Sequence, residues 1–511
     1  MMQCVLRTTR VTASPQWLAS ASRSTLNLTQ TRHASLTHLD ETRNGRERVV
    51  VLGSGWGGYT VSRDLDPKKY QVLVVSPRSY FVFTPLLAGT SVGTLEFRTI
   101  LEPIRPFKKR GSATEYFQGW ADQVDLDKKT LTIEEAVEDP VSTKALTSSS
   151  NEEKTVSVRT GERINEARKG ELFSIEWDKL IVGVGCYAQT FNTPGVKQNA
   201  YFLKDAGDAR RIRNRLLSCF EIAALPTTNE EMKRHFLNFA VVGGGPTGIE
   251  WSAELHDLIY EDMRRLYPGL IKYVNITVYD VAPQILSMFD ESLGKYAMKH
   301  FQRQGIAIKT QHHIEELRQG VPEGMQTPSG VKDGSSLYTL KLKEEGEIPV
   351  GMCVWSTGLA MNPFVENALK GRVKQHEKSH AIMTDARLQA KDSHDVPIPD
   401  VYAIGDCAIL EGTSYPATAQ VANQKARWLA KRLNKGDIDR TEFQYRDLGV
   451  MAYIGGRKGI LQSGKSDISG WLAWVIWRGA YLTKTVSWRN RILIPIYWSI
   501  NWLFGRDISR F

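Results

Sequence analysis

Short apolar runs that end in glycines divide the chain into strand, turn and helix. Residues 49–52 (VVVL) have the uniformly apolar pattern of a buried strand, and residues 53–58 (GSGWGG) follow at once. A helical stretch then reaches about residue 65, and residues 70–75 (YQVLVV) predict a second strand. This order opens a βαβ unit and predicts an α/β protein with parallel strands.

The same order returns later in the chain. Residues 239–242 (FAVV) predict a strand, residues 243–248 (GGGPTG) a turn, and residues 249–259 a helix. The next strand, residues 274–278 (VNITV), is followed closely by Asp280. The two turns begin at positions 53 and 243, which are 190 residues apart. That separation is too long for a solenoid repeat but suits two dinucleotide-binding domains.

Elsewhere the pattern is less regular. Residues 137–170 are rich in Ser, Thr, Glu and Lys without a period, which is typical of a solvated surface insertion. Residues 177–185 (WDKLIVGVG) predict another strand that ends in glycines. No uncharged apolar run reaches about 18 residues, and residues 470–477 and 492–504 are too short to span a bilayer.

The first glycine turn has the spacing that binds a pyrophosphate. Gly53 permits the tight turn, Gly55 lets backbone N–H groups approach the phosphates, and Gly58 lets the helix pack on the strand. Ser76 and Arg78 stand where an acidic ribose ligand is usual. Serine offers one hydroxyl and arginine suits a 2′-phosphate, so the motif alone leaves FAD and NADP as alternatives.

The second turn is closer to the dinucleotide pattern. Gly243, Gly245 and Gly248 fill its three positions. The carboxylate of Asp280 can accept hydrogen bonds from ribose hydroxyls and would repel a 2′-phosphate, which favours NADH over NADPH. Asp280 lies 37 residues after Gly243, however, where about 20 is usual. An exposed aspartate at a strand end is therefore the alternative.

Further positions carry candidate chemistry. Glu250 either complements the helix dipole or faces a nicotinamide–flavin junction. Asp406 either binds a ribityl hydroxyl or caps a helix. Gln420 and Gln424 share one helix face and suit the carbonyls of a quinone, although such a pair is also typical of a solvated face.

Composition and charge narrow the class of protein. The 511 residues are 41% hydrophobic and 24% charged, which excludes a wholly disordered or collagen-like chain. Of the net charge of +10, residues 1–39 carry +4, residues 471–511 carry +5, and the other 431 residues carry +1. Because the charge lies at the ends, it favours an anionic bilayer over a nucleic acid as partner.

Both ends have a distinctive composition. Residues 1–39 contain four arginines, many Ser and Thr, and no Asp or Glu, as a mitochondrial transit peptide does; a plain disordered tail is the alternative. Six tryptophans lie in residues 471–511, and Trp471, Trp474 and Trp477 recur every third residue. Basic residues among Trp and Tyr are typical of an interfacial helix on a bilayer, and a buried packing helix is the alternative. The five cysteines form no CxxC pair, so neither a disulfide framework nor a metal site is expected.

Taken together, the motifs resemble those of the type II NADH dehydrogenases, the non-proton-pumping NADH:quinone oxidoreductases of fungal and plant mitochondria and many bacteria. The resemblance spans about residues 47–511. It rests on GSGWGG (53–58), YFVFTPLL (80–87), VVGGGPTGIE (241–250), YAIGDC (402–407), AQVANQ (419–424) and FGRDISR (504–510).

This resemblance implies two Rossmann-like domains, the second inserted in the first, as in pyridine nucleotide-disulfide oxidoreductases, plus an amphipathic membrane-binding region. The expected segments are a transit peptide (1–39), an FAD-binding domain (47–235 and 361–440) with an insertion at 137–170, an NADH-binding domain (236–360), and the membrane-binding region (441–511). It implies FAD at the first turn and Asp406, NADH at the second turn and Asp280, and a quinone at Gln420 and Gln424. Glu250 would lie beside the nicotinamide. The full set of residues expected to bind cofactors is Gly53, Ser54, Gly55, Gly57, Gly58, Ser76, Arg78, Thr84, Gly185, Gly243, Gly244, Gly245, Gly248, Asp280, Gly358, Gly405 and Asp406.

The expected function is electron transfer from NADH through FAD to ubiquinone, without proton pumping, in the mitochondrial respiratory chain. The resemblance implies a homodimer bound peripherally to the inner membrane through residues 471–511, with no nucleic-acid partner. Two alternatives stay open. A sulfide:quinone oxidoreductase would need a redox pair, for which Cys186 and Cys353 are the candidates. An apoptosis-inducing-factor-like flavoprotein would have a binding role.

Overall fold

The computed structural model describes residues 36–105, 114–136, 171–325, 337–464 and 466–509. Residues 1–35 of the predicted transit peptide and the whole predicted insertion at 137–170 lie outside this part of the chain. The chain divides into two compact units, Met1–Asn44 and Gly45–Phe511. Helix α1 (Leu36–Glu41) belongs to the first unit. All the elements below belong to the second.

The largest sheet has ten strands and is parallel at its centre. The central strands, in order across the sheet, are β21 (Pro397–Ala403), β8 (Lys179–Val182), β1 (Glu47–Leu52), β2 (Tyr70–Ser76) and β5 (Thr114–Asp125). Every residue of β2 and all but the first of β1 are buried. Parallel strands are covered on both faces, which explains why residues 49–52 of β1 and 72–75 of β2 form continuous apolar runs instead of alternating.

Shorter strands extend both edges of this sheet. On the β5 side, β6 (Thr130–Glu135) and β7 (Leu172–Glu176) add in antiparallel fashion. On the β21 side lie β20 (Gln389–Lys391), β19 (Ile382–Thr384) and β22 (Ala408–Leu410).

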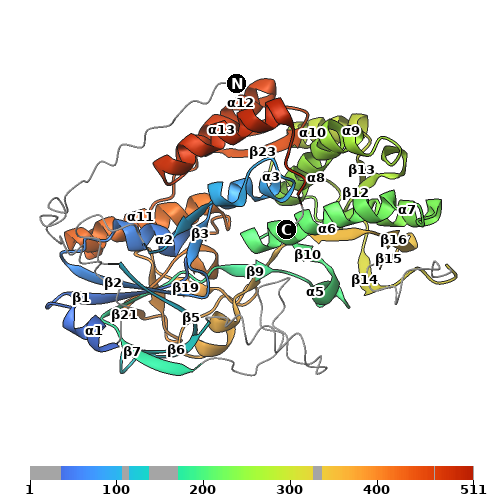
Figure 1. Cartoon of the computed structure of the whole chain (residues 1–511). Helices are drawn as coiled ribbons and strands as arrows, with labels where there is room; N and C mark the ends of the chain where they lie inside the picture. The colour runs from blue at the N-terminus through green and yellow to red at the C-terminus, as the bar shows by residue number, and fades with distance from the viewer. Residues whose placement is uncertain (1–35, 106–113, 137–170, 326–336, 465, 510–511) are drawn as a thin grey trace, which may run out of the picture. The chain divides into compact units, whose positions relative to one another are not determined.

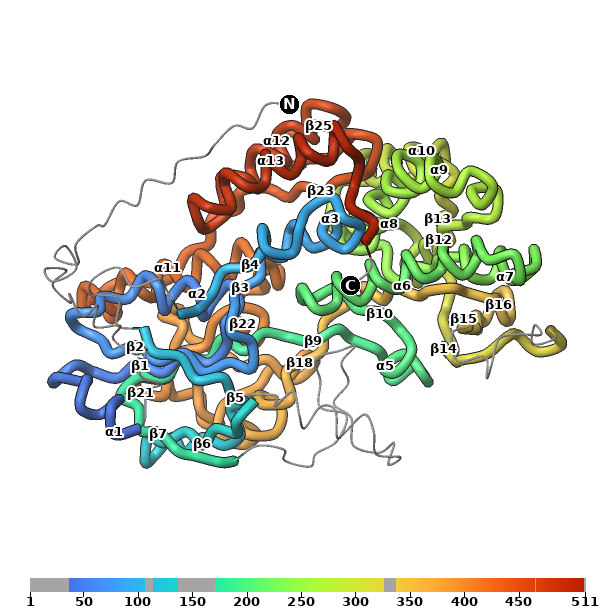
Figure 2. Tube along the Cα trace, in the orientation of Figure 1, coloured from blue at the N-terminus to red at the C-terminus, as the bar shows by residue number. Residues whose placement is uncertain are grey.

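A second, wholly parallel sheet is inserted between strands of the first. Its order is β10 (Tyr201–Phe202), β17 (Met352–Trp355), β11 (Asn238–Val242), β12 (Asn275–Asp280) and β13 (Ala307–Thr310). The chain leaves the first sheet after β8 and returns to it with β19, β20 and β21, of which β21 pairs with β8 in register. Figure 2 traces the second domain between these segments. The predicted α/β fold with two Rossmann-like domains is confirmed.

One short strand of the second sheet precedes the segment expected to form the NADH-binding domain. Strand β10 falls within the range 47–235 that was assigned to the FAD-binding domain, yet it pairs with β17 of the second sheet. A strand of two residues has no periodicity that a sequence pattern can show, which is why it was missed. The two segments that connect the domains also pair with each other. They contain β9 (Cys186–Ala188) and β18 (Leu359–Met361), which form a two-stranded antiparallel sheet.

Helices cover the two sheets and lead to the C-terminal region. Helix α11 (Ala419–Lys435) lies against α2 (Trp56–Asp64), where Asn423 Nδ2 donates to Thr60 Oγ1 at 2.9 Å. Helix α6 (Ala206–Ala224) follows β10, and α8 (Pro246–Leu258) follows β11. After α8 come η3 (Ile259–Met263) and α9 (Arg264–Leu266), which occupy the long gap before Asp280 that the sequence indicated.

The C-terminal region consists of a small antiparallel sheet and two helices. The strands are β23 (Val450–Gly455), β24 (Lys458–Ser463) and β25 (Ser466–Gly470). Helices α12 (Trp471–Lys484) and α13 (Trp488–Phe504) follow and lie side by side, as the red segments of Figure 1 show. Among the described residues, no helix is both long and apolar enough to cross a membrane.

Candidate active site

A cavity of about 1600 Å³ is lined by residues of both Rossmann-like domains and of the C-terminal region. Most of the predicted site residues line it: Gly53, Ser54, Gly55, Gly57, Ser76, Arg78, Thr84, Gly185, Glu250, Gly405, Asp406, Gln420 and Gln424. Others do not: Gly58, Gly243, Gly244, Gly245, Gly248, Asp280 and Gly358. The structure therefore brings the first turn, Glu250 and the glutamines together and leaves most of the second turn outside.

Both glycine turns have the same backbone geometry. Gly53 and Gly243 have φ values of +100° and +114°, which a residue with a Cβ rarely adopts. A Cβ added at Gly58 would collide with the carbonyl oxygen of Gly53, and one at Gly248 with that of Gly243. Each turn therefore needs glycine at its first position for conformation and at its last position for helix–strand contact, as dinucleotide-binding turns do.

The polar residues at the end of β2 and just after it already have partners within the chain. The Ser76 hydroxyl lies 3.0 Å from that of Ser54, and it accepts from the Arg78 backbone N–H at 3.2 Å. The Arg78 guanidinium forms an ion pair with Asp205 at 2.6 Å. The charge of Arg78 is therefore compensated from within the chain, which removes the main argument for a 2′-phosphate, and hence NADP, at the first turn.

Asp406 is positioned by the end of β21. It lies in the short helical turn η7 (Gly405–Cys407), and its backbone oxygen accepts from Cys186 Sγ at 3.1 Å. Its carboxylate has no hydrogen bond or ion pair with any described residue. Burial raises the pKa of this carboxyl above its ordinary value, although Lys204 and Lys425 oppose that rise. An acceptor of this kind on the wall of a cavity suits a ligand hydroxyl.

The glutamine pair holds a loop against the cavity. The Gln424 amide donates to the Arg446 carbonyl at 2.9 Å and accepts from its N–H at 3.0 Å. Gln420 accepts from the Tyr445 hydroxyl and donates to the Gly449 carbonyl at 3.3 Å. The two side chains share one face of α11, as predicted, but they also shape the segment 445–449.

Glu250 connects the second domain to the C-terminal region. Its Oε1 accepts from the Tyr453 N–H of β23 at 3.1 Å and from Trp477 Nε1 of α12 at 3.2 Å. Burial raises the pKa of Glu250 to about 8 despite these two donors. A carboxyl with that pKa is mostly protonated at neutral pH.

A second cavity has a volume of about 1080 Å³, and Glu250 lines both cavities. Two more carboxyl groups of α8 line the second cavity at helical spacing, Glu254 and Asp257. Glu254 accepts from the Thr94 hydroxyl at 2.7 Å, and Asp257 accepts from the hydroxyl of Tyr453. Burial raises the pKa of Glu254 to about 7, although Arg506 opposes the rise. These acids lie at i+4 and i+7 from Glu250, a spacing that places all three on one helix face and is the sequence signal for this cluster.

Asp280 supports the second turn directly. One carboxylate oxygen accepts from the Gly244 N–H, and the other accepts from the Ala282 N–H at 2.7 Å. The carboxylate is partly exposed, and it lies next to the backbone of the turn that the sequence assigned to NADH. The roles of Asp280 and Gly358 in cofactor binding stay predictions.

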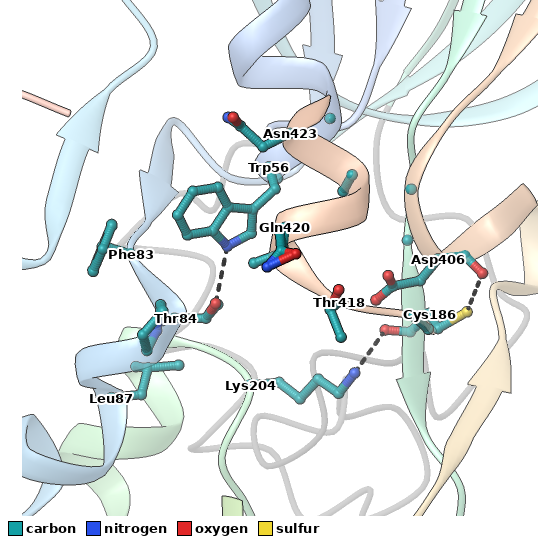
Figure 3. Close-up of a pocket in the computed structure, with 18 of the residues that line it drawn as sticks. Trp56, Phe83, Thr84, Leu87, Cys186, Lys204, Asp406, Thr418, Gln420 and Asn423 are labelled. Atoms are coloured by element: carbon teal, nitrogen blue, oxygen red, sulfur yellow. Dashed lines mark hydrogen bonds between the residues drawn. The ribbon is translucent and has the colours of Figure 1, made fainter. Parts of the chain in front are cut away.

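Other lining residues carried no sequence signal. Trp56 Nε1 donates to Thr84 Oγ1 at 2.9 Å, and the helix N-cap Thr418 and the ammonium of Lys204 also face this space (Figure 3). Cys353, one of the two candidate redox cysteines, is buried in β17 and does not line the cavity, whereas Cys186 does. The structure therefore does not place that pair together in the cavity.

Comparisons with known proteins agree with this geometry. Residues 47–426 match the pyridine nucleotide-disulphide oxidoreductase family, and residues 448–507 match the NDH2 C-terminal domain. A probable NADH dehydrogenase of Dictyostelium discoideum is 36% identical, with 91% of each chain covered. The mitochondrial external NADH-ubiquinone oxidoreductase 2 of Saccharomyces cerevisiae is 34% identical, with 91% of this chain and 82% of the yeast protein covered.

A solved structure shows the same fold. NDH2 from Plasmodium falciparum in complex with NADH superposes with a TM-score of 0.75 at 23% identity, covering 91% of this chain and all of the other. The chain belongs to the pyridine nucleotide-disulphide oxidoreductase family and, within it, to the type II NADH dehydrogenases.

The raised pKa of Glu254 predicts a pH-dependent stability. In the native state the Glu254 carboxyl stays protonated up to about pH 7, whereas in the unfolded chain it ionises near pH 4.5. Its contribution to the free energy of unfolding is therefore complete below pH 4.5 and is lost as the pH rises through 7. Between pH 5 and 8 this loss is on the order of 3 kcal/mol. Glu254→Gln stays neutral and keeps an acceptor for Thr94, so its melting temperature should fall less over this range.

Thermal unfolding at several pH values measures the effect. Glu261→Gln is the matched control, because Glu261 forms an ion pair with Arg506 at 2.9 Å but is exposed, whereas Glu254 is buried. The control should keep the wild-type pH dependence. Parallel curves for Glu254→Gln and the wild type would show that Glu254 is ionised in the native protein.

Proposed function

We propose that this protein oxidises NADH and reduces ubiquinone, with FAD carrying the electrons between them and without proton pumping. One observation carries the proposal. The first glycine turn, Glu250 of the second domain and the glutamine pair of α11 all line a single cavity. NADH, FAD and ubiquinone can therefore come together in one cavity.

The residues of the first domain fit FAD. The tight approach of Gly58 to the Gly53 carbonyl leaves the N–H groups at the start of α2 available for a pyrophosphate. Asp406 offers a carboxylate without a partner among the described residues, as a ribityl hydroxyl requires. FAD, when bound, supplies the redox chemistry by accepting a hydride and passing two electrons on, while the protein supplies orientation and electrostatics.

Residues of the second domain would present NADH to this cavity. Its turn and Asp280 would hold the adenosine half, and Pro246, Thr247 and Glu250 line the cavity at the start of α8. Since Glu250 is mostly protonated at neutral pH, it holds a proton where the reduction of a quinone to a quinol takes protons up.

The surface of the C-terminal helices supports membrane binding. Along α13 the exposed side chains Trp488, Ile492, Ile496 and Ile500 follow at intervals of four residues, and Trp488 is 75% exposed. Such an apolar stripe, with Arg489 and Lys484 nearby, is typical of a helix that lies in a bilayer interface. We place the protein on the mitochondrial inner membrane, and the predicted homodimer belongs to the same proposal.

Asp280→Asn should relax the discrimination against NADPH. Removing the carboxylate removes its repulsion of the 2′-phosphate, so the ratio of kcat/KM for NADPH to that for NADH should rise roughly tenfold or more. Steady-state kinetics with both nucleotides measure the ratio. Glu291→Gln, an exposed acid in the same domain, should leave it unchanged. An unaltered preference in Asp280→Asn would remove Asp280 from the ribose site.

Gln424→Leu should slow quinone reduction more than flavin reduction. The substitution removes two hydrogen bonds to Arg446 on the acceptor side, and losses of about 0.7 kcal/mol each correspond to roughly a tenfold effect. Stopped-flow absorbance resolves the two half-reactions. The exposed glutamine variant Gln302→Leu serves as the control. Equal losses in both half-reactions would instead indicate a role for Gln424 in folding.

The α13 stripe predicts a vesicle-binding defect. Ile492→Asp with Ile500→Asp should reduce co-sedimentation with phosphatidylcholine–cardiolipin vesicles at least tenfold, since burying each isoleucine is worth about 1.5–3 kcal/mol. Flavin content should not change. The control is Phe191→Asp with Leu225→Asp, which adds the same charge at two other exposed apolar residues. Equal binding by the two double variants would contradict the proposed membrane face.

A further inference from the structure

Lys204 places an uncompensated cation in the main cavity. It follows β10 and precedes α6, and its backbone N–H is held by the Asp208 carboxylate at 2.9 Å. Its ammonium reaches across the cavity toward Cys186 and Asp406, as Figure 3 shows. Within the described part of the chain, Nζ donates one long hydrogen bond, 3.5 Å, to the Cys186 carbonyl. An ammonium has three donors, so two of them are left for a ligand.

The nearby acids do not neutralise Lys204. Asp205 is paired with Arg78 at 2.6 Å, and Asp208 is paired with Arg211. Asp406 attracts the ammonium electrostatically, but no ion pair joins the two within the described part of the chain. Burial, opposed by Asp406, lowers the pKa of Lys204 below its ordinary value. A partly buried cation is costly unless an anion meets it, so its position points to negative charge that arrives with a ligand.

Three anionic groups could come near this cavity: the pyrophosphates of FAD and of NADH, and the reduced flavin ring. The pyrophosphate of NADH belongs at the second glycine turn, whose glycines do not line the cavity. The pyrophosphate of FAD belongs at the N–H groups after Gly53, at the start of α2. Lys204 instead lies with Cys186, Asp406 and Thr418, which is the N-cap of α11 (Figure 3). We propose that Lys204 is the cation that stabilises the negative charge on the reduced isoalloxazine ring and so raises the reduction potential of the bound flavin. This rests on the proposed function, because it requires FAD in the cavity.

Sulfite tests the proposal without turnover. It adds through its sulfur lone pair to the oxidised flavin ring and leaves negative charge on that ring, with no other reactant consumed. Lys204→Met keeps the chain length without the charge, so its holoenzyme should bind sulfite at least tenfold more weakly. Spectroelectrochemistry should show a two-electron potential lower by about 30 mV, which is the equivalent of a tenfold change. Lys204→Arg should stay within threefold of the wild type.

The control removes an exposed lysine that does not line the cavity. Lys431→Met changes such a lysine on α11, and its sulfite affinity and flavin potential should match the wild type. Unchanged sulfite affinity in Lys204→Met, or weaker ADP-ribose binding with an unchanged potential, would overturn the proposal. If Lys204→Met does not retain flavin, the comparison of Lys204→Arg with Lys204→Gln replaces it. A flavin potential that is unchanged in Lys204→Arg and lowered in Lys204→Gln supports the proposal. Equal flavin potentials in these two variants refute it. Absence of flavin from the wild type would instead refute the proposed function.

Discussion

The parallel pairing of β21 with β8 brings the residues of the proposed active site together. β21 joins the first sheet only after the chain has built the whole second sheet, and the two strands pair in register from Val401 with Leu180. The carboxyl ends of parallel strands meet at one edge, so Gly405 and Asp406 arrive beside the turn that begins at Gly53. Helix α11 starts soon afterwards and brings Gln420 and Gln424 to the same cavity. The positions of Asp406 and of the two glutamines therefore depend on this return of the chain.

The C-terminal region is fixed to that site through one acidic face of α8. Glu250 accepts hydrogen bonds from N–H groups of β23 and α12, and Asp257 accepts one from the Tyr453 hydroxyl. Three carboxyl groups on one partly buried face would be costly if all were ionised. Their cost falls if Glu250 and Glu254 are largely protonated near neutral pH. The same protonation that makes the face tolerable also leaves a proton on the cavity wall.

Sequence patterns predicted the strands and turns whose requirements lie within a few neighbouring residues. Continuous apolar runs gave β1, β2 and β11, and glycine spacing gave both turns, because parallel strands and phosphate-binding turns impose their requirements within a few residues. Glu250 was a candidate from its helix position alone, but its partners lie more than 200 residues away. The pairing of Gln424 with Arg446, the strand β10 and the placement of Lys204 all depend on tertiary contacts. No periodicity reports such contacts.

The tryptophans of α12 combine the two alternatives for that segment, an interfacial helix on a bilayer and a buried packing helix. Trp477 is buried against Glu250, whereas Trp471 is 64% exposed, so one helix both packs on the protein and presents an apolar surface. Tyr481 and Lys484 of the same helix line the main cavity, and Arg491 of α13 lines it as well. In the proposed membrane-bound state, an acceptor dissolved in the lipid would therefore meet the cavity beside the helices that touch the bilayer. A short path of this kind spares an apolar quinone from crossing water, which is the physical reason to combine the membrane-binding surface and the acceptor site in one pair of helices.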